Sequence, residues 1–239
     1  MIVRTRSIVL NYFRYGETDL IVNLYTEELG RQTIFVKGAH NKKSAVRSVL
    51  FQPLYLVETE IHHRSNRQMQ RISSIQVCQI LQGIPFDPVK SSIAFFIAEI
   101  LGKTLKEEEA NPDLFNFLYQ AIQTLDLNER GTANFHLLFL IHYTRYLGFY
   151  PHSEDSPDNL WIDLRQNHMM VFPLLPSYME FNQLLSRLYH TGFERLGDIH
   201  LDHHQRNELT EFILSYYSKH VDDFGKVKSF PILRNVFQD

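Results

Sequence analysis

The sequence predicts an α+β protein, in which a five-stranded antiparallel barrel is followed by a mainly α-helical part. The first eighty residues form short runs rich in β-branched and aromatic residues, separated by turn signals. After Pro85 and Pro88 the apolar residues recur with helical spacing instead. Because 239 residues suffice for two small domains, we expect a barrel domain over residues 1–80 and a helical domain over 81–239.

The strand part divides at its turn residues. The five expected strands are residues 2–13, 19–26, 31–37, 54–61 and 70–77. The fourth alternates an apolar face with Glu58 and Glu60, and residues 63–67 form the tip of the last hairpin. Five short strands in this length are typical of an OB-fold, although an SH3-like barrel would give nearly the same pattern.

The helical part shows an apolar stripe in each of its expected helices. They begin near Pro88 and Asn111, and then cover residues 132–147, 178–189 and 201–220. The third is apolar nearly all round, so it should be central, and Gly148 should be its C-cap. An irregular insertion with four prolines is expected at about 149–178.

The single cysteine restricts the chemistry. Cys78 alone excludes an intramolecular disulfide and any zinc site built on several thiolates, and we expect it to be a small core residue. The apolar runs are too short for a signal-peptide core or a membrane span, which indicates a cytoplasmic protein with no membrane partner.

No catalytic motif is present in the sequence, which lacks a P-loop, a nucleophile elbow, a zincin helix and paired CxxC spacings. We therefore expect no enzyme, no catalytic residue and no cofactor. His200, Asp202, His203 and His204 resemble a metal cluster. However, they directly precede an amphipathic helix that Asp202 would cap, so no metal is expected there.

Charge is unevenly distributed along the chain. Residues 1–80 carry eleven Lys and Arg against six Asp and Glu, a balance of +5, whereas residues 81–239 carry 13 against 21, a balance of −8. A basic part beside an acidic part suggests that polyanions bind the first. Uneven placement of solubilising charge is the alternative.

Two basic loops are the candidate DNA contacts, because cations near phosphates release counterions and give salt-sensitive, largely sequence-independent affinity. The first loop leaves a strand through Gly38, and the second lies at the last hairpin together with His62 and His63. Hairpin loops of an OB-fold flank its ligand groove. The expected DNA-binding residues are Lys37, His40, Lys42, Lys43, Arg47, Arg64, Arg67 and Arg71.

Barrel aromatics could add stacking platforms for bases. The candidates are Tyr12, Phe13, Tyr15, Phe35 and Tyr55, although most aromatic residues in a barrel belong to its core. The sequence also leaves open an OB-fold protein–protein adaptor, whose barrel docks a peptide and whose basic patch only solubilises it.

Several segments together resemble the RecO family. They are residues 5–10 (TRSIVL), 15–22 (YGETDLIV), Gly30, 36–39 (VKGA), Lys43-Ser44, Gln52-Pro53, 143–151 (YTRYLGFYP) and 225–233 (GKVKSFPIL). The match covers nearly the whole chain, and the order of the segments is its most specific feature. Many family members bind zinc through four cysteines after the central helix, whereas residues 152–170 of this chain contain no cysteine.

The resemblance implies an N-terminal OB-fold, a helical C-terminal domain and a role in the RecF pathway of recombinational repair. Such proteins bind single- and double-stranded DNA, anneal complementary strands, and work with RecR to load RecA onto DNA coated by single-strand-binding protein (SSB). It also implies a nucleoid-associated location, and a helical domain that binds the acidic C-terminal tail of SSB. The basic C-terminal run is the expected tail site, through Lys226, Lys228, Phe230 and Arg234.

Overall fold

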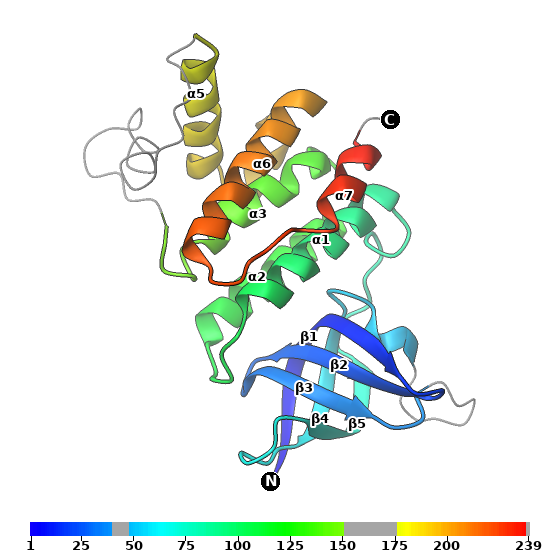
Figure 1. Cartoon of the computed structure of the whole chain (residues 1–239). Helices are drawn as coiled ribbons and strands as arrows, with labels where there is room; N and C mark the ends of the chain where they lie inside the picture. Colours follow the sequence, from blue (N-terminus) through cyan, green and yellow to red (C-terminus); the bar gives the residue numbers. More distant parts are fainter. Residues whose placement is uncertain (40–47, 151–175, 238–239) are drawn as a thin grey trace. The chain divides into compact units, whose positions relative to one another are not determined.

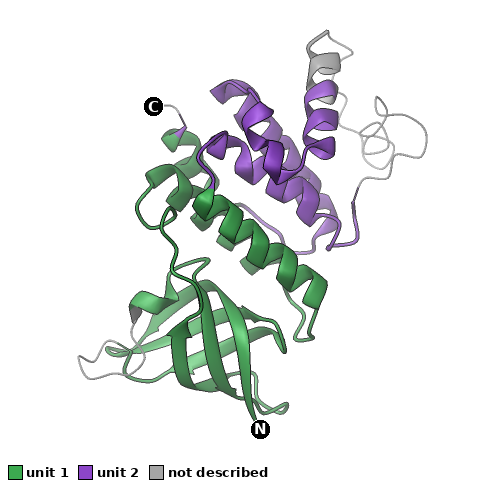
Figure 2. Ribbon diagram, turned by 180° about the vertical axis from the view of Figure 1, so that it is seen from behind, with its two compact units in different colours: residues 1–127, 227–236 green, residues 128–226, 237–239 purple. Residues whose placement is uncertain are grey.

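The computed structural model describes residues 1–39, 48–150 and 176–237, which form two compact units (Figure 2). Unit 1 comprises Met1–Leu127 together with Val227–Val236, and unit 2 comprises Asn128–Lys226 with Phe237–Asp239. The sequence-based boundary at residue 80 separates strands from helices, whereas the compact units divide after Leu127. The first two helices and the last one therefore belong to the same unit as the barrel.

The N-terminal strands form a closed barrel, shown in blue to teal in Figure 1. The strands are β1 (Ile2–Tyr15), β2 (Asp19–Thr26), β3 (Gly30–Val36), β4 (Leu56–His62) and β5 (Gln70–Val77). Their order around the barrel is β1-β2-β3-β5-β4, with β3 and β5 parallel and the other described pairs antiparallel. This closed five-stranded arrangement confirms the predicted OB-fold.

Two strand ends differ from the prediction by two residues, for backbone reasons. β1 continues to Tyr15 because Arg14 and Tyr15 still pair with Leu20 and Asp19 of β2, beyond a register shift between Val9 and Asn11. β4 begins only at Leu56, because Leu54 has a φ of 63° and lies in a turn. The Leu54 N–H donates to the Val9 carbonyl at 2.7 Å.

The barrel interior is a continuous apolar core, to which the short helix η1 (Ser48–Phe51) contributes the fully buried Phe51. Tyr12 and Tyr55 pack against this core from its margin. Its buried members are Val9, Leu20, Val22, Leu24, Ile34, Val36, Ala39, Phe51, Val57 and Ile61. Burial of these side chains, at about 25 cal/mol per Å² of apolar area, stabilises the barrel.

Helices α1 (Pro88–Thr104) and α2 (Pro112–Leu127) cover part of the outer barrel surface. The Arg31 guanidinium donates to the carbonyls of Gly102 and Leu105 at 2.9 and 2.5 Å, so it caps the C-terminal end of α1. Burial lowers the pKa of Arg31. Tyr25 stacks on Phe115 with ring centroids 6.3 Å apart, and its burial raises the pKa of Tyr25 to about 12.

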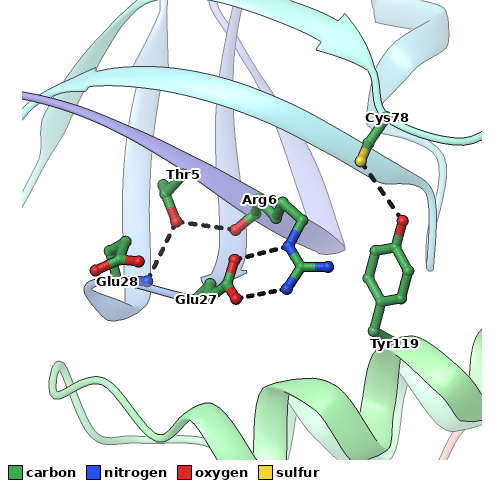
Figure 3. A network of polar contacts seen from close by, with 6 residues as sticks. All are labelled: Thr5, Arg6, Glu27, Glu28, Cys78 and Tyr119. Carbon is green, nitrogen blue, oxygen red and sulfur yellow. Dashed lines mark hydrogen bonds and ion pairs between the residues drawn. The ribbon is translucent and has the colours of Figure 1, made fainter.

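A second polar contact joins the barrel to α2 (Figure 3). The Arg6 guanidinium makes two hydrogen bonds to the Glu27 carboxylate, at 2.7 and 2.5 Å, which lowers the pKa of that carboxyl. The same guanidinium lies 5.0 Å from the centroid of the Tyr119 ring. The cation–π contact therefore ties β1 to α2, and the ion pair holds the guanidinium in place beside the Tyr119 ring.

The prediction that Cys78 is a core residue is wrong, because the thiol is exposed. Cys78 directly follows the last residue of β5, beyond the core-facing positions of that strand. Its sulfur lies 3.5 Å from the Tyr119 hydroxyl (Figure 3).

The C-terminal helix α7 (Phe230–Val236) packs on α1. The Glu99 carboxylate accepts hydrogen bonds from the N–H groups of Lys228 and Ser229 and from the Ser229 hydroxyl, at 2.6 to 2.9 Å. Phe230 lies against Phe96, with 6.4 Å between ring centroids. These contacts place the returning segment in unit 1.

Unit 2 is helical, with α3 (Phe135–Tyr143) buried along nearly its whole length, as predicted. Its other elements among the described residues are η2 (Thr132–Asn134), α5 (Pro176–His190), η4 (Phe193–Asp198) and α6 (His203–His220). α3 ends four residues earlier than predicted, because the Thr144 hydroxyl donates a hydrogen bond back to the Ile141 carbonyl. Tight turns follow as far as Gly148, which has a φ of 79°. Asp202 caps α6 in a capping box with Gln205, as predicted.

A buried polar network joins α3 to α6. The Arg206 guanidinium donates to the Asn134 side chain and to the Leu201 carbonyl, both at 2.9 Å. His136 Nε2 lies 2.9 Å from the Thr210 hydroxyl. Burial and the Arg206 charge lower the pKa of His136 to about 3, so this imidazole is neutral.

Most of the expected insertion at 149–178, including the cysteine-free residues 152–170, lies outside the described residues. Within the described ranges, no group of three or more His, Cys, Asp or Glu residues could hold a metal ion. His204 instead lies 3.4 Å from the Glu208 carboxylate. None of the helices in these ranges is long and apolar enough to cross a membrane.

Candidate nucleic-acid interface

The outward-pointing side chains of β1, β2 and β3 form rows across the barrel surface. Strand register places Phe13 beside Ile21 and Ile21 beside Phe35, and in the parallel pair Phe35 is partnered with Arg71 of β5. The next row toward the helices is Asn11, Asn23 and Thr33. The row after that contains Tyr25 and Arg31, which α1 and α2 cover. Among the described residues, α1 and α2 leave uncovered the end of this face that carries the Phe13 row.

Three aromatic rings lie on the open end. Phe13 and Tyr15 are 57% and 58% exposed, and Tyr15 meets Phe35 edge-to-face at 5.9 Å. Tyr12 and Tyr55 point the other way, toward the core. Of the five aromatics considered from the sequence, Phe13, Tyr15 and Phe35 are therefore placed where a base could reach them.

Exposed cations flank these rings. Arg71 neighbours Phe35 across the β3–β5 pair, and Lys37 directly follows β3. Arg14 is exposed at the end of β1. Among the described residues, no carboxylate pairs with any of these three side chains. Their charge is therefore available to an anionic ligand.

The loop between β4 and β5 presents two more arginines in a fixed backbone conformation. Gln70, almost fully buried, accepts a hydrogen bond from the Arg64 N–H at 2.9 Å and donates to the carbonyls of Arg64 and Arg67 at 3.0 and 2.8 Å. Arg64 and Arg67 are exposed, with no ion-pair partner among the residues that the structure describes. Sequence reasoning missed Gln70, because a glutamine that starts a strand carries no distinctive signal.

The first basic loop is held at its base by Asp19. The Asp19 carboxylate accepts from the Gly38 N–H at 2.7 Å, and Gly38 has a φ of 67°, which favours glycine. Lys37 is exposed beside this turn. His40, Lys42, Lys43 and Arg47 lie outside the described residues.

Other cations of the N-terminal part are used by the fold itself. Arg4 pairs with Glu58 at 2.6 Å, Arg6 pairs with Glu27, and Arg31 caps α1. The count of eleven Lys and Arg in residues 1–80 therefore overstates the number of cations that a ligand could use. Counting charges along the sequence could not separate these three from the exposed group.

The residues expected to bind a partner lie in different surroundings. Lys228 and Arg234 are exposed in unit 1, and Phe230 is partly buried against Phe96. Lys226 is exposed and belongs to unit 2. Phe230 is thus at least partly a packing residue of α7.

The barrel, its exposed rings and its flanking cations define an OB-fold protein with an attached helical region. The chain matches the family Recombination protein O N terminal over residues 1–81 and the family Recombination protein O C terminal over residues 85–157. It is 35% identical to the DNA repair protein RecO of Phocaeicola vulgatus, and 36% identical to that of Bacteroides fragilis. Each alignment covers 99% of this chain and 100% of the relative. The chain therefore belongs to the RecO family of DNA repair proteins.

Proposed function

We propose that this chain is a recombination mediator that binds single- and double-stranded DNA, promotes strand annealing and helps to load RecA onto DNA coated by SSB. The observation that carries the proposal is the set of exposed cations without described carboxylate partners on an OB-fold barrel: Lys37, Arg64, Arg67 and Arg71. The bound molecule would be a polyanion, since these side chains have no described counter-charge.

Annealing on such a surface needs no covalent step. Each Lys or Arg that meets a phosphate releases condensed counterions, so binding is strong at low salt and largely independent of sequence. Neutralised strands repel one another less, which allows complementary bases to pair. The proposal therefore assigns no catalytic residue and no cofactor to this chain.

Membership of the RecO family supports RecR and the acidic SSB tail as protein partners. An acidic tail with an apolar tip requires cations around an apolar contact. Lys228 and Arg234 are exposed near the partly buried Phe230, which fits that requirement. A protein with these partners would act at the nucleoid in the cytoplasm.

The decisive experiment is a salt titration of binding to single-stranded and duplex DNA by the wild-type chain and by Arg64→Gln with Arg67→Gln. Removing two phosphate contacts should weaken binding at low salt and reduce the log–log salt slope by about 1.4 for single strands and about 1.8 for duplex. Lys228→Gln with Arg234→Gln removes the same charge elsewhere and should leave DNA binding unchanged. A wild-type chain with no salt-sensitive DNA affinity would instead support the protein–protein adaptor.

A further inference from the structure

We propose that the open end of the β1–β3 face is a short stacking platform for about two or three unpaired nucleobases, with its length limited by α1 and α2. The platform consists of Phe13, Tyr15 and Phe35. This inference rests on the proposed DNA-binding function and adds to it the part of DNA that the barrel recognises and the number of bases that it holds.

The exposure of the rings is the first reason. Phe13 and Tyr15 expose more than half of their surface, although Tyr12 of the same strand packs against the core. Tyr15 also makes an edge contact with Phe35, so the rings form a group rather than isolated side chains. Every nucleobase has a π-face, and exposed rings bind unstacked bases without regard to sequence.

The row beside the rings explains why recognition would be sequence-tolerant. The Asn23 amide donates to the Asn11 side chain at 2.7 Å, and the Asn23 carbonyl oxygen accepts from the Thr33 hydroxyl at 2.8 Å. Because Asn23 is buried and each of its polar ends already has a partner within the barrel, its side chain is not placed to read base edges.

Helices α1 and α2 set the length of the platform. A β-carbon on Gly102 of α1 would lie 3.2 Å from the Asn11 side-chain nitrogen, so α1 reaches the Asn row itself. From Asn11 to Tyr15 the open strand spans roughly 13 Å, at about 3.3 Å per residue. With one base for each ring, the platform holds about two or three bases, below the ~4–16 nucleotides that OB-folds usually cover.

Two cations beside the rings are placed to bind the sugar–phosphate backbone. Arg71 lies in the same row as Phe35, and Lys37 continues β3 just past it. If bases stack over the rings, the phosphates of the same nucleotides would point toward these two cations. In a duplex the bases are paired and stacked on one another, so the platform would engage only unpaired strands.

The test compares three oligomers at one salt concentration: a thymidine strand, an abasic strand with the same number of phosphates, and a duplex. The wild-type chain should bind thymidine at least about fivefold more tightly than the abasic strand, since each stacked base contributes at least this much. Phe13→Ala with Tyr15→Ala removes two of the three rings, so it should reduce that preference at least about fivefold and leave duplex affinity unchanged. Phe86→Ala with Phe95→Ala removes two exposed aromatics of unit 1 outside this face, 82% and 54% exposed, and should keep the preference.

The number of bases follows from abasic strands that carry one to six consecutive thymidines. Affinity should rise until about the third thymidine and then stay constant. Equal wild-type affinity for the thymidine and abasic strands would overturn the platform but leave the proposed DNA binding intact. A preference that is undiminished in the Phe13/Tyr15 variant would overturn the location of the platform, and one that keeps growing beyond four thymidines would overturn its length. A chain that binds none of the oligomers would overturn the proposed function, and the platform with it.

Discussion

The side-chain ammonium of Lys90 lies 2.7 Å from the main-chain oxygen of Asp126, and both residues are buried. The Asp126 carboxylate in turn accepts hydrogen bonds from three consecutive backbone N–H groups, those of Gln82, Gly83 and Ile84, each at 2.8 Å. The end of α2 therefore holds the connection between the barrel and α1 in one conformation.

Removing this carboxylate should destabilise unit 1. In Asp126→Ala three N–H groups lose their acceptor, and we expect a loss of about 2–5 kcal/mol in the free energy of unfolding. Chemical denaturation followed by circular dichroism measures this loss. Asp113→Ala, at an exposed position of the same helix, should cost under about 1 kcal/mol. Gly83→Ala should also destabilise, because its β-carbon would lie 2.1 Å from the Asp126 carbonyl oxygen.

Loss of the Gln70 side chain should weaken DNA binding without any change of charge. Gln70→Ala frees the backbone of Arg64 and Arg67, so the two guanidinium groups must be ordered when DNA binds. We expect a decrease of several-fold in affinity for single-stranded DNA, measured by fluorescence anisotropy. Gln68→Ala, at an exposed position of the same loop, is the matched control. Equal affinities for both variants would show that the loop conformation is irrelevant to binding.

Reversal of charge in the first basic loop should act through phosphates. Lys42→Glu with Lys43→Glu is expected to weaken binding roughly uniformly across DNA sequences, and to reduce the salt slope by about 1.4 to 1.8, depending on the strand form. A salt titration with two unrelated sequences checks both statements. Affinity unchanged at low salt would remove this loop from the interface.

A peptide with the acidic, apolar C-terminal sequence of SSB should bind through the C-terminal cations. Isothermal calorimetry with the full chain should show weaker binding for Lys228→Gln with Arg234→Gln than for the wild type. Arg64→Gln with Arg67→Gln carries the same charge change and should bind the peptide normally. If Arg64→Gln with Arg67→Gln weakens peptide binding and Lys228→Gln with Arg234→Gln does not, the tail site lies on the barrel.

Acid should destabilise unit 2 through His136. Its folded pKa, lowered to about 3, lies below the value of about 6.5 for an unfolded histidine, so the unfolded state binds more protons between these values. Stability is therefore complete above about pH 6.5 and should fall by about 1.4 kcal/mol per pH unit as the pH decreases toward 3. Burial also lowers the pKa of His142, which adds to the same trend.

Amide hydrogen exchange in α3 and α6, measured from pH 7 to pH 4, tests this dependence. His136→Gln has no titrating group at this position and should show a flatter pH profile, even if it is less stable overall. His204→Gln changes an exposed imidazole and should keep the wild-type slope. Identical slopes for all three proteins would contradict the role of His136.

The sequence was sufficient for the strands and for most helices, because each has a periodic apolar face that local residues determine. It placed Asp202 as a helix cap and Pro88 at a helix start, since capping depends on neighbours in the chain. The end of β1 depends on a register shift, and the late start of β4 depends on the left-handed conformation of Leu54. Neither of these two backbone features has a sequence signature.

The candidate site was harder to predict, because the partners of a cation are distant in sequence. Arg6 and Arg31 resemble Arg64 and Arg71 in the sequence, yet the first two contact Glu27 and α1, respectively. Only the fold shows which cations remain exposed. The same holds for the aromatics, since the shift in β1 decides that Tyr12 faces the core and Phe13 faces outward.

The return of Val227–Val236 to α1 has a consequence for synthesis on the ribosome. Phe96 and Glu99 meet Phe230 and Ser229 only after the whole of Asn128–Lys226 has been translated. At ~5–20 residues per second, this delay lasts roughly 5–20 seconds. During that time the nascent chain presents Phe96 and Glu99 of α1 without their partners in the last segment, and a chaperone could bind there.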